Sequence, residues 1–259
     1  MNILEKIFNC EIEYTSCFCQ VTKHQDFIRF QDDAIPDMYY HNYTCVINAE
    51  NDAALVQFIE SEIARNQNES KDFCLIRCYT PVGESIAGQL THEPDISVSG
   101  HYMYDFAGHA EFVMPEDKRI VRVSNDGLLE EMLNLDLAHD EESLGIDFCT
   151  RRVYRRRDAY FSDGSLDAYI CYYNGVAVGS CSLFIHGDIA KIEDFAVLPQ
   201  YQRKGIGTAI IKNLIDVAWR NNVTVVYLET DEDDTAKEMY IKCGFYRVGD
   251  DITDLIFRF

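Results

Sequence analysis

Hydrophobic and polar residues follow regular periods along the second half of the chain, from Arg119 onwards. Runs in which every second residue is apolar are typical of half-buried strands, and apolar residues three and four positions apart are typical of helices. The predicted strands are Arg119–Ser124, Asp167–Tyr173, Val176–Ile185, Ile189–Val197, Val223–Thr230, Tyr246–Val248 and Leu255–Phe259. The predicted helical segments are Leu128–Leu137, Leu144–Tyr160, Thr208–Arg220 and Asp234–Cys243. We therefore expect an α/β fold, a mixed central sheet flanked by helices.

Two short motifs mark the ends of predicted elements. Asn174-Gly175 separates two β-rich runs and is the strongest hairpin signal in the chain, because both residues accept the positive φ angles of a tight hairpin turn. Asn125-Asp126-Gly127 predicts a turn that can also cap the helix beginning at Leu128.

The first part of the chain has a weaker pattern. It predicts strands at Cys45–Asn48, Phe73–Tyr79 and Tyr102–Phe106 and a helix at Asp52–Arg65, with neither a phosphate-binding glycine pattern nor a convincing internal repeat. A chain of 259 residues is long enough for two modest domains. We therefore predict a smaller N-terminal α/β domain over residues 1–118 and a second domain over residues 119–259.

Charge and hydropathy exclude several kinds of partner. The formal net charge of −21 argues against binding of nucleic acid or of an anionic membrane surface, because both need a cationic footprint. It would attract a cationic substrate, unless it serves solubility alone. No stretch reaches the roughly 18 apolar residues of a membrane span, and Glu5 and Lys6 lie where a signal peptide would be apolar. We expect a cytoplasmic protein, monomeric or homodimeric.

Cysteine, histidine and arginine residues give no strong site signal. The ten cysteines form no CxxC pair, which indicates reduced, mostly buried thiols and no metal site. Histidines such as His41 lack ligand spacing to each other and are interpreted as structural. The arginine run that begins at Arg151 could bind phosphate, but at helical spacing it favours a solvated face bonded to neighbouring acids. Its members are Arg151, Arg152, Arg155, Arg156 and Arg157.

A glycine-rich turn joins a predicted strand to a predicted helix and has the features of a ligand-binding site. Pro199 ends the strand Ile189–Val197, and Gly205-Ile206-Gly207 opens the helix that follows. The N–H groups at a helix start, with the positive end of the helix dipole behind them, can hold a pyrophosphate, and glycine lets it approach the backbone closely. The turn therefore predicts an anion site.

The sequence of this turn resembles the Q/R-x-x-G-x-G/A signature of the GNAT superfamily of N-acetyltransferases. The matching residues run from Gln202 to Gly207, and a second matching pattern is Ala236-x-x-x-Tyr240-x-x-x-Gly244-Phe245. A P-loop is the rival, but no Gly-Lys-Ser/Thr follows and no Rossmann GxGxxG is present. The resemblance covers residues 119–259 and implies a GNAT fold that uses acetyl-CoA as co-substrate. Since tandem copies are known in the family, the N-terminal domain is compatible with a degenerate second copy.

The resemblance also implies roles for individual residues. Phe195 would donate its N–H to the thioester carbonyl, Val197 would line the pantetheine arm, and Tyr240 would protonate the departing CoA thiolate. The family often has Asn at the position of Asp233, which puts a direct cofactor contact there in doubt. The residues that the resemblance assigns to acetyl-CoA binding are Phe195, Ala196, Val197, Gln202, Arg203, Lys204, Gly205, Ile206, Gly207 and Thr208.

An acceptor amine must lose a proton before it attacks, because its pKa is near about 10.4. Glu193 and Asp194 precede the glycine turn and would face opposite sides of their strand if its pleat is regular. They resemble the diamine and polyamine branch of the family, which implies that Glu193 relays the amine proton and that Asp194 binds the cationic acceptor. The alternative is that both are solvated strand-edge charges, or that one pairs with Lys191. Glu229 and Asp231 on the neighbouring strand would add to the negative electrostatic potential at this place.

The expected function is N-acetyl transfer to a small primary amine, with polyamines as one class. No Cys or Ser lies in a motif for a covalent nucleophile, so we expect direct attack in a ternary complex without a metal. A non-catalytic acyl-CoA-binding module and a protein N-terminal or lysine acetyltransferase are the alternatives.

Overall fold

The computed structural model describes residues 2–79, 82–162, 164–233 and 236–259. It contains two compact units, each made of segments that are distant in the sequence. The first unit comprises Met1–Tyr14, His101–Thr230 and Asp234–Val248. The second unit comprises Thr15–Gly100, Asp231–Asp233 and Gly249–Phe259. This grouping differs from a single division between residues 118 and 119.

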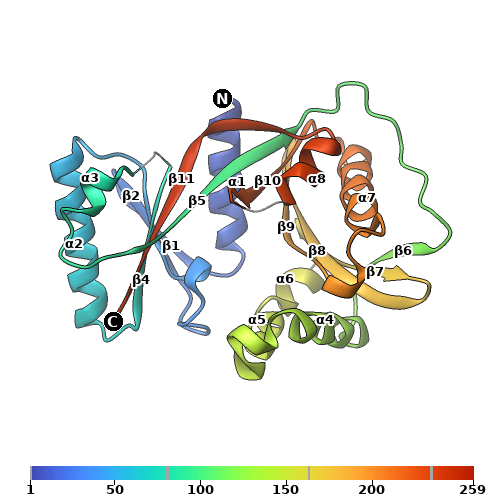
Figure 1. The fold of residues 1–259 in the computed structure, drawn as a ribbon, viewed down its shortest axis with the longest axis horizontal. Coiled ribbons are helices and arrows are strands. Elements are labelled where there is room, and N and C mark those ends of the chain that lie inside the picture. The colour runs from blue at the N-terminus through green and yellow to red at the C-terminus, as the bar shows by residue number, and fades with distance from the viewer. Residues whose placement is uncertain (1, 80–81, 163, 234–235) are drawn as a thin grey trace. The chain divides into compact units, whose positions relative to one another are not determined.

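The first unit is built on a mixed sheet (Figure 1). From one edge inward, β6 (Lys118–Arg122), β7 (Leu166–Tyr173), β8 (Val176–His186) and β9 (Ile189–Val197) pair antiparallel in sequence order. The next strand, β10 (Val225–Asp231), runs parallel to β9 and is followed by β5 (Asp95–Tyr104). The crossover from β9 to β10 contains the helix α7 (Ile206–Arg220).

Helices cover both faces of this sheet (Figure 1). On one face α7 packs against β6 to β9, and its apolar side chains share one core with Val178, Leu183, Ile192 and Phe245. Against the other face lie α4 (Asp126–Leu144), α5 (Ile146–Arg155) and α6 (Arg157–Phe161). The unit also includes most of α1 (Ile3–Ser16) and α8 (Ala236–Lys242).

The second unit is a smaller α/β arrangement with its own core. Its strands β1 (Gln20–Lys23), β2 (Phe27–Gln31), β3 (Thr44–Val46) and β4 (Phe73–Cys78) are followed in the sheet by the end of β11 (Tyr246–Arg258). β3 and β4 are parallel, and α2 (Asp52–Asn68) connects them. Ile59, Ile76 and Phe257 lie in the core, and a short helix, α3 (Glu84–Ala87), is also present. The predicted fold class, a mixed sheet flanked by helices with a second α/β unit, is confirmed.

Several helices and strands begin or end where the sequence predicts, because of local capping and turn residues. The side chain of Asn125 accepts a hydrogen bond from the N–H of Leu128 and so caps α4. Asn174 and Gly175 have φ angles of +49° and +82°, the left-handed pair that closes a two-residue hairpin between β7 and β8. Strand β9 has the predicted bounds, and α7 begins two residues before the predicted start.

Other elements differ from the predictions. The predicted strands Tyr246–Val248 and Leu255–Phe259 belong to one strand, β11, so the predicted break between them was wrong. The middle of β11 carries exposed Gly249 and Asp250 and half-buried Asp251, a composition typical of a turn, and Gly249 has a positive φ of +74° within the strand. The segment Leu144–Tyr160 splits into α5 and α6, and α1, β1, β2 and α3 were not predicted. Two residues of the predicted helix Asp234–Cys243, 234 and 235, lie outside the described residues.

Two further sequence interpretations can be compared with the structure. All ten cysteines are free thiols and seven of them are buried, as predicted. No helix within the described ranges is both long enough and apolar enough to cross a bilayer.

Candidate active site

Strand β9 contains one residue more than its neighbour where the predicted site begins. Ser182 pairs with Glu193 and Ser180 pairs with Ala196, so three steps along β9 oppose two along β8. Asp194, within this bulge, has a φ of +52°, a left-handed conformation that is uncommon for a residue other than glycine. The pleat is therefore irregular, and the condition under which Glu193 and Asp194 would face opposite sides is not met.

The pairing of β9 with β10 ends at the same place. The parallel register runs from Ile189 and Val225 to Ile192 and Leu228. Glu193 and Glu229 are thus the first residues beyond the last pair, one on each strand. Backbone N–H and C=O groups need hydrogen-bond partners, so an extended ligand with amide groups can bind along an edge where two strands part.

The glycine turn follows directly at the start of α7. Arg203 and Gly205 have φ angles of +62° and +71°, and Gly205 caps the helix without a side-chain hydrogen bond. Gln202 donates from Nε2 to the carbonyl of Val197 at 3.2 Å, which ties the turn to the end of β9. Residues 202–205 are exposed. An exposed helix start without a side-chain cap suits an anion, because its first N–H groups lack partners within the helix.

Tyr240 lies on α8 beside the bulge. Its side chain is 7% exposed, and its ring meets that of Phe195 edge to face at 6.0 Å between centroids. A Cβ on Gly207 would lie 2.7 Å from Sδ of Met239 and 3.2 Å from Cζ of Phe195. The absence of a side chain at 207 therefore lets α7, α8 and β9 meet. The structure brings Tyr240, Phe195 and the glycine turn together.

The carboxylate of Asp194 is bound inside the first unit. It forms an ion pair with Arg156, and it accepts hydrogen bonds from the hydroxyls of Ser182 at 3.3 Å and Tyr14 at 3.4 Å. Burial by itself would raise the pKa of Asp194, but the Arg156 guanidinium outweighs it and holds that pKa below its usual value. These contacts anchor the bulge. Acceptor binding by Asp194 stays a prediction.

The arginine run divides into two kinds of contact. Arg151, Arg152 and Arg157 pair with acids of α4 and α5, as the solvated-face interpretation expected. Arg156 is 7% exposed and instead forms an ion pair with Asp194 in the bulge. Sequence reasoning missed this role, because nothing within the run distinguishes Arg156 from its neighbours.

Glu193 belongs to a second charged group. Its carboxylate lies 2.7 Å from the ammonium of Lys191, which also donates to Oε2 of Glu11 at 2.7 Å. Burial raises the pKa of Glu193, and the positive charge of Lys191 opposes that rise only in part. For Lys191 burial alone would lower the pKa, but Glu11 and Glu193 raise it above its usual value. Glu193 therefore pairs with Lys191, which the sequence analysis gave as one of the alternatives.

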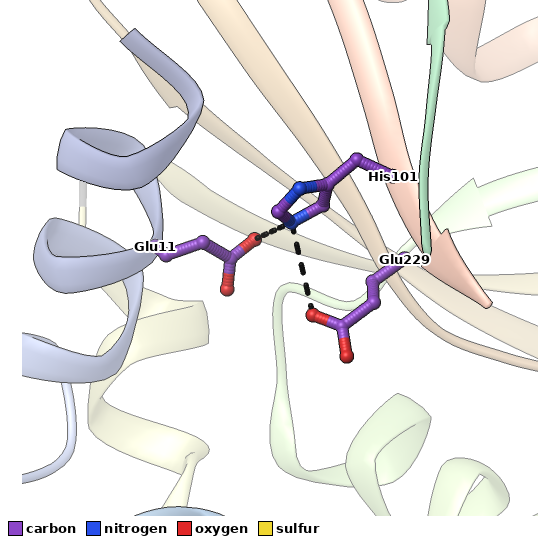
Figure 2. Close-up of side chains that lie close together, drawn as sticks. All are labelled: Glu11, His101 and Glu229. Carbon is purple, nitrogen blue, oxygen red and sulfur yellow. Dashed lines mark ion pairs between the residues drawn. The ribbon is translucent and has the colours of Figure 1, made fainter. Parts of the chain in front are cut away.

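Glu11 and His101, which the sequence did not indicate, form a cluster with Glu229 that extends this group. Figure 2 shows Glu11 from α1, His101 from β5 and Glu229 from β10 pointing toward one another. Nε2 of His101 lies 3.8 Å from Oε1 of Glu11 and 3.8 Å from Oε2 of Glu229, and all three ligand-type atoms lie within 4.8 Å of one another. No local motif could have indicated this cluster, since its members are separated by about a hundred residues each.

Comparisons with known proteins show similarity to acetyltransferases. The model of the Acetyltransferase (GNAT) family matches residues 131–245. The uncharacterized N-acetyltransferase CgeE of Bacillus subtilis (strain 168) is 30% identical over 112 residues, which span 41% of this chain and 43% of CgeE. The chain thus matches less than half the length of that relative.

Solved structures share the fold over nearly the whole chain. A GCN5-related N-acetyltransferase from Kribbella flavida superposes with a TM-score of 0.71 at 14% identity, over 99% of this chain and 96% of that one. A tandem GNAT protein from the clavulanic acid biosynthesis pathway gives a TM-score of 0.60 at 13% identity, over 96% and 87%. At these identities the likeness concerns the fold.

Proposed function

We propose that this chain, whose residues 131–245 are an acetyltransferase domain of the GNAT family, transfers acetyl from acetyl-CoA to a small primary amine. The observation that carries the proposal is the meeting of three features along β9 and at the start of α7. These are the bulge at Asp194, the end of pairing between β9 and β10, and the glycine turn before α7. Together they offer a bent edge for pantetheine and an anion site for pyrophosphate.

Acetyl-CoA would bind along β9 and over the turn. The thioester carbonyl would accept a hydrogen bond from the N–H of Phe195, pantetheine would follow Ala196 and Val197, and the pyrophosphate would lie at residues 202–208. A donor fixed at the position of the developing oxyanion is worth about 3 to 4 kcal/mol in acyl transfer. Because the bulge fixes the backbone at Phe195, that donor would need little reorganisation.

The protons of the reaction would move between neighbouring side chains. Tyr240 would protonate the departing thiolate, since a phenol with a pKa near about 10 keeps its proton at neutral pH and can still transfer it to a thiolate near about 8.5. Glu193, one third exposed and bonded to Lys191, would relay the amine proton toward solvent. Asp194 would hold the bulge through Arg156 and add negative charge near the acceptor.

Acetyl-CoA binding is tested by thermal unfolding. Acetyl-CoA at about a hundred times its Kd stabilises the folded state by about 2.7 kcal/mol, which raises Tm by about 5 to 10 °C for a chain of this size. Gly205→Glu should abolish the shift, because a carboxylate would occupy the anion site. Gly187→Glu is the matched control, since Gly187 also has a positive φ, +62°, and open space around it. Absence of a shift in the native protein at millimolar acetyl-CoA would overturn the proposal.

The acceptor is tested by the release of free CoA. The panel contains diamines, spermidine, simple alkylamines and short peptides with free N-termini or lysines. Chromatography should separate the CoA, because the protein's own ten thiols react with thiol reagents. Release with the small amines supports the proposal, and release with peptides alone contradicts it.

A further inference from the structure

The cluster of Glu11, His101 and Glu229 lies within the first unit beside the predicted site. Glu11 is 3% exposed and His101 is 5% exposed, while the side chain of Glu229 is 14% exposed. Oε1 of Glu11 makes no hydrogen bond to any described residue. Figure 2 shows this oxygen aimed at His101. A buried carboxylate oxygen without a donor indicates that a cationic or hydrogen-bonding ligand belongs there.

The spacing of the three atoms can be compared with that around a metal ion and that around an ammonium group. Ligand atoms around zinc, at about 2.0 to 2.1 Å from the ion, are about 3.4 Å apart, and those around an octahedral magnesium are about 3.0 Å apart. A primary ammonium with three hydrogen bonds of about 2.8 Å at tetrahedral angles separates its acceptors by about 4.6 Å. The observed separations run from 3.8 Å up to a limit of 4.8 Å. The two separations of 3.8 Å lie between the metal and ammonium values, so the spacing admits either ligand, and the ammonium is chosen because the proposed reaction needs an amine acceptor.

The same group of acids already binds one ammonium. Nζ of Lys191 lies 2.7 Å from Oε2 of Glu11, 2.7 Å from Oε2 of Glu193 and 4.6 Å above the ring of Tyr14. Glu11, Glu193 and Glu229 supply three carboxylates around the ammonium of Lys191 and the ring of His101. An ammonium between Glu11 and Glu229 would lie beside two of these carboxylates, as Lys191 lies beside Glu11 and Glu193.

We propose, on the premise of the acetyl transfer described above, that Glu11, His101 and Glu229 bind the primary ammonium of the acceptor and that Nε2 of His101 takes its proton. Glu229 directly follows Leu228, the last residue of β10 that pairs with β9. The ammonium therefore lies at the place where the strands part, beside the position proposed for the thioester.

The reaction balances with His101 in this role. The ammonium gives one proton to Nε2, and the freed nitrogen lone pair forms a bond to the thioester carbon. When the C–S bond breaks, the sulfur takes a proton from Tyr240, and the nitrogen loses its second proton, which restores Tyr240 through solvent. The imidazolium of His101 then releases the first proton to solvent by way of the Glu193 relay proposed above, so one proton ends on CoA and one in solvent. The first transfer moves a positive charge from ammonium to imidazole without changing the total charge of the cluster.

The site also predicts selectivity among amines. A primary ammonium has three N–H groups, one for each acceptor atom, whereas a secondary ammonium has two and a tertiary ammonium has one. Each lost bond leaves a buried acceptor unsatisfied. We therefore expect kcat/KM to fall at least tenfold from propylamine to N-methylpropylamine and further to N,N-dimethylpropylamine, which binds but forms no stable amide.

The test uses the full chain with saturating acetyl-CoA and propylamine as the probe. Glu229→Gln should raise the KM for propylamine at least tenfold and leave the thermal shift with acetyl-CoA unchanged. Glu11→Gln should act in the same way, but it also disturbs Lys191, so Glu229→Gln decides if Glu11→Gln fails to fold. Asp216→Asn is the matched control, because Asp216 is also buried and lies 3.3 Å from a histidine, His109.

The proton role of His101 is read from kcat and its pH profile. His101→Gln should lower kcat by about a hundredfold or more, the usual effect of losing a general base. The rate of the variant should keep rising with pH where the native rate levels off. Glu11 of α1 and Tyr227 and Glu229 of β10 face His101, and Lys191 of β9 interacts in turn with Glu11, Glu193 and Glu229. An unchanged profile in the folded variant would overturn this role.

A binding experiment separates this inference from the reaction on which it rests. Propylammonium chloride should bind to the native protein and not to Glu229→Gln, with tetramethylammonium chloride at equal ionic strength as the reference. If this holds while acetyl-CoA does not bind, acetyl transfer is wrong and the ammonium site stands. Equal behaviour of both salts would overturn the ammonium site. So would stoichiometric Zn²⁺ or Mn²⁺ binding that Glu229→Gln abolishes, which would assign a metal site.

Discussion

Tyr240 illustrates how one side chain combines packing with chemistry. It is buried against Phe195 and Phe245, so its ring contributes to the core of the first unit whatever its hydroxyl does. Only the hydroxyl distinguishes the two roles.

Tyr240→Phe should lower turnover about a hundredfold, because the thiolate loses its proton donor while the ring contacts persist. The acetyl-CoA thermal shift should stay within a degree or two of the native shift. Tyr169→Phe is the control, a buried tyrosine in the same unit whose hydroxyl bonds to Asp167. Steady-state CoA release and thermal unfolding measure both effects. Full turnover in Tyr240→Phe would leave Tyr240 with a structural role alone.

Asp194 and Arg156 form the ion pair that holds the bulge. Removing one partner of a buried ion pair costs about 3 to 5 kcal/mol, and Asp194 is 24% exposed, so we expect Asp194→Asn to lower the free energy of unfolding by about 2 to 3 kcal/mol. Asp147→Asn removes the exposed partner of Arg151 and should cost about 0.3 to 0.5 kcal/mol. Urea unfolding of both variants measures the difference.

The pH dependence of that difference has a definite sign. The folded-state pKa of Asp194 is lowered, so its stabilisation is present above the unfolded pKa of about 3.9 and is lost as the pH falls through the folded value. The native protein and Asp194→Asn should therefore differ by a constant amount above about pH 5 and converge below about pH 4. A difference that grows toward acid would contradict the ion pair. Glu193, whose pKa is raised, should contribute in the opposite direction.

At the scale of elements, the close approach of β8 to β9 shapes the bulge. A Cβ on Gly179 would lie 2.6 Å from the carbonyl oxygen of Ala196, so the backbone of β9 itself would have to move. At Gly207 the nearest atom belongs to the flexible side chain of Met239.

Gly179→Ala should therefore be the more harmful of the two substitutions. We expect it to lower the free energy of unfolding by about 2 to 3 kcal/mol and to weaken acetyl-CoA binding, since Ala196 lies on the proposed pantetheine edge. Gly207→Ala should cost about 1 kcal/mol, and Gly83→Ala, with only a contact at 3.9 Å, serves as the neutral control. Thermal unfolding with and without acetyl-CoA tests this order. Equal effects at 179 and 207 would argue against backbone displacement.

At the scale of the whole molecule, the net charge of −21 acts on both stability and binding. Like charges on one chain repel each other, and salt screens this repulsion over about 10 Å at 0.1 M. We expect Tm to rise between about 20 and 200 mM NaCl, while the KM for a cationic acceptor also rises because its long-range attraction is screened. Differential scanning fluorimetry and initial rates follow the two quantities. A KM that does not respond to salt would mean that the charge serves solubility alone.

The sequence by itself determined the local features of this protein. Alternation and helical spacing placed β6 to β10 and α7, and Asn174-Gly175 closed the predicted hairpin, because each signal depends on residues that are neighbours in the chain. The glycine turn and Tyr240 were predicted together from two motifs, and the structure brings both beside Phe195.

Only the tertiary structure decided how the charged residues of the site are grouped. The extra residue in β9 is defined against its partner strand β8, so no period within β9 could predict the left-handed Asp194. Arg156, between α5 and α6, pairs with Asp194, and Glu11, His101 and Glu229 come from α1, β5 and β10. Such contacts join residues that are distant in the sequence, and they form because burial of the sheet and helices brings these charges together where water cannot screen them.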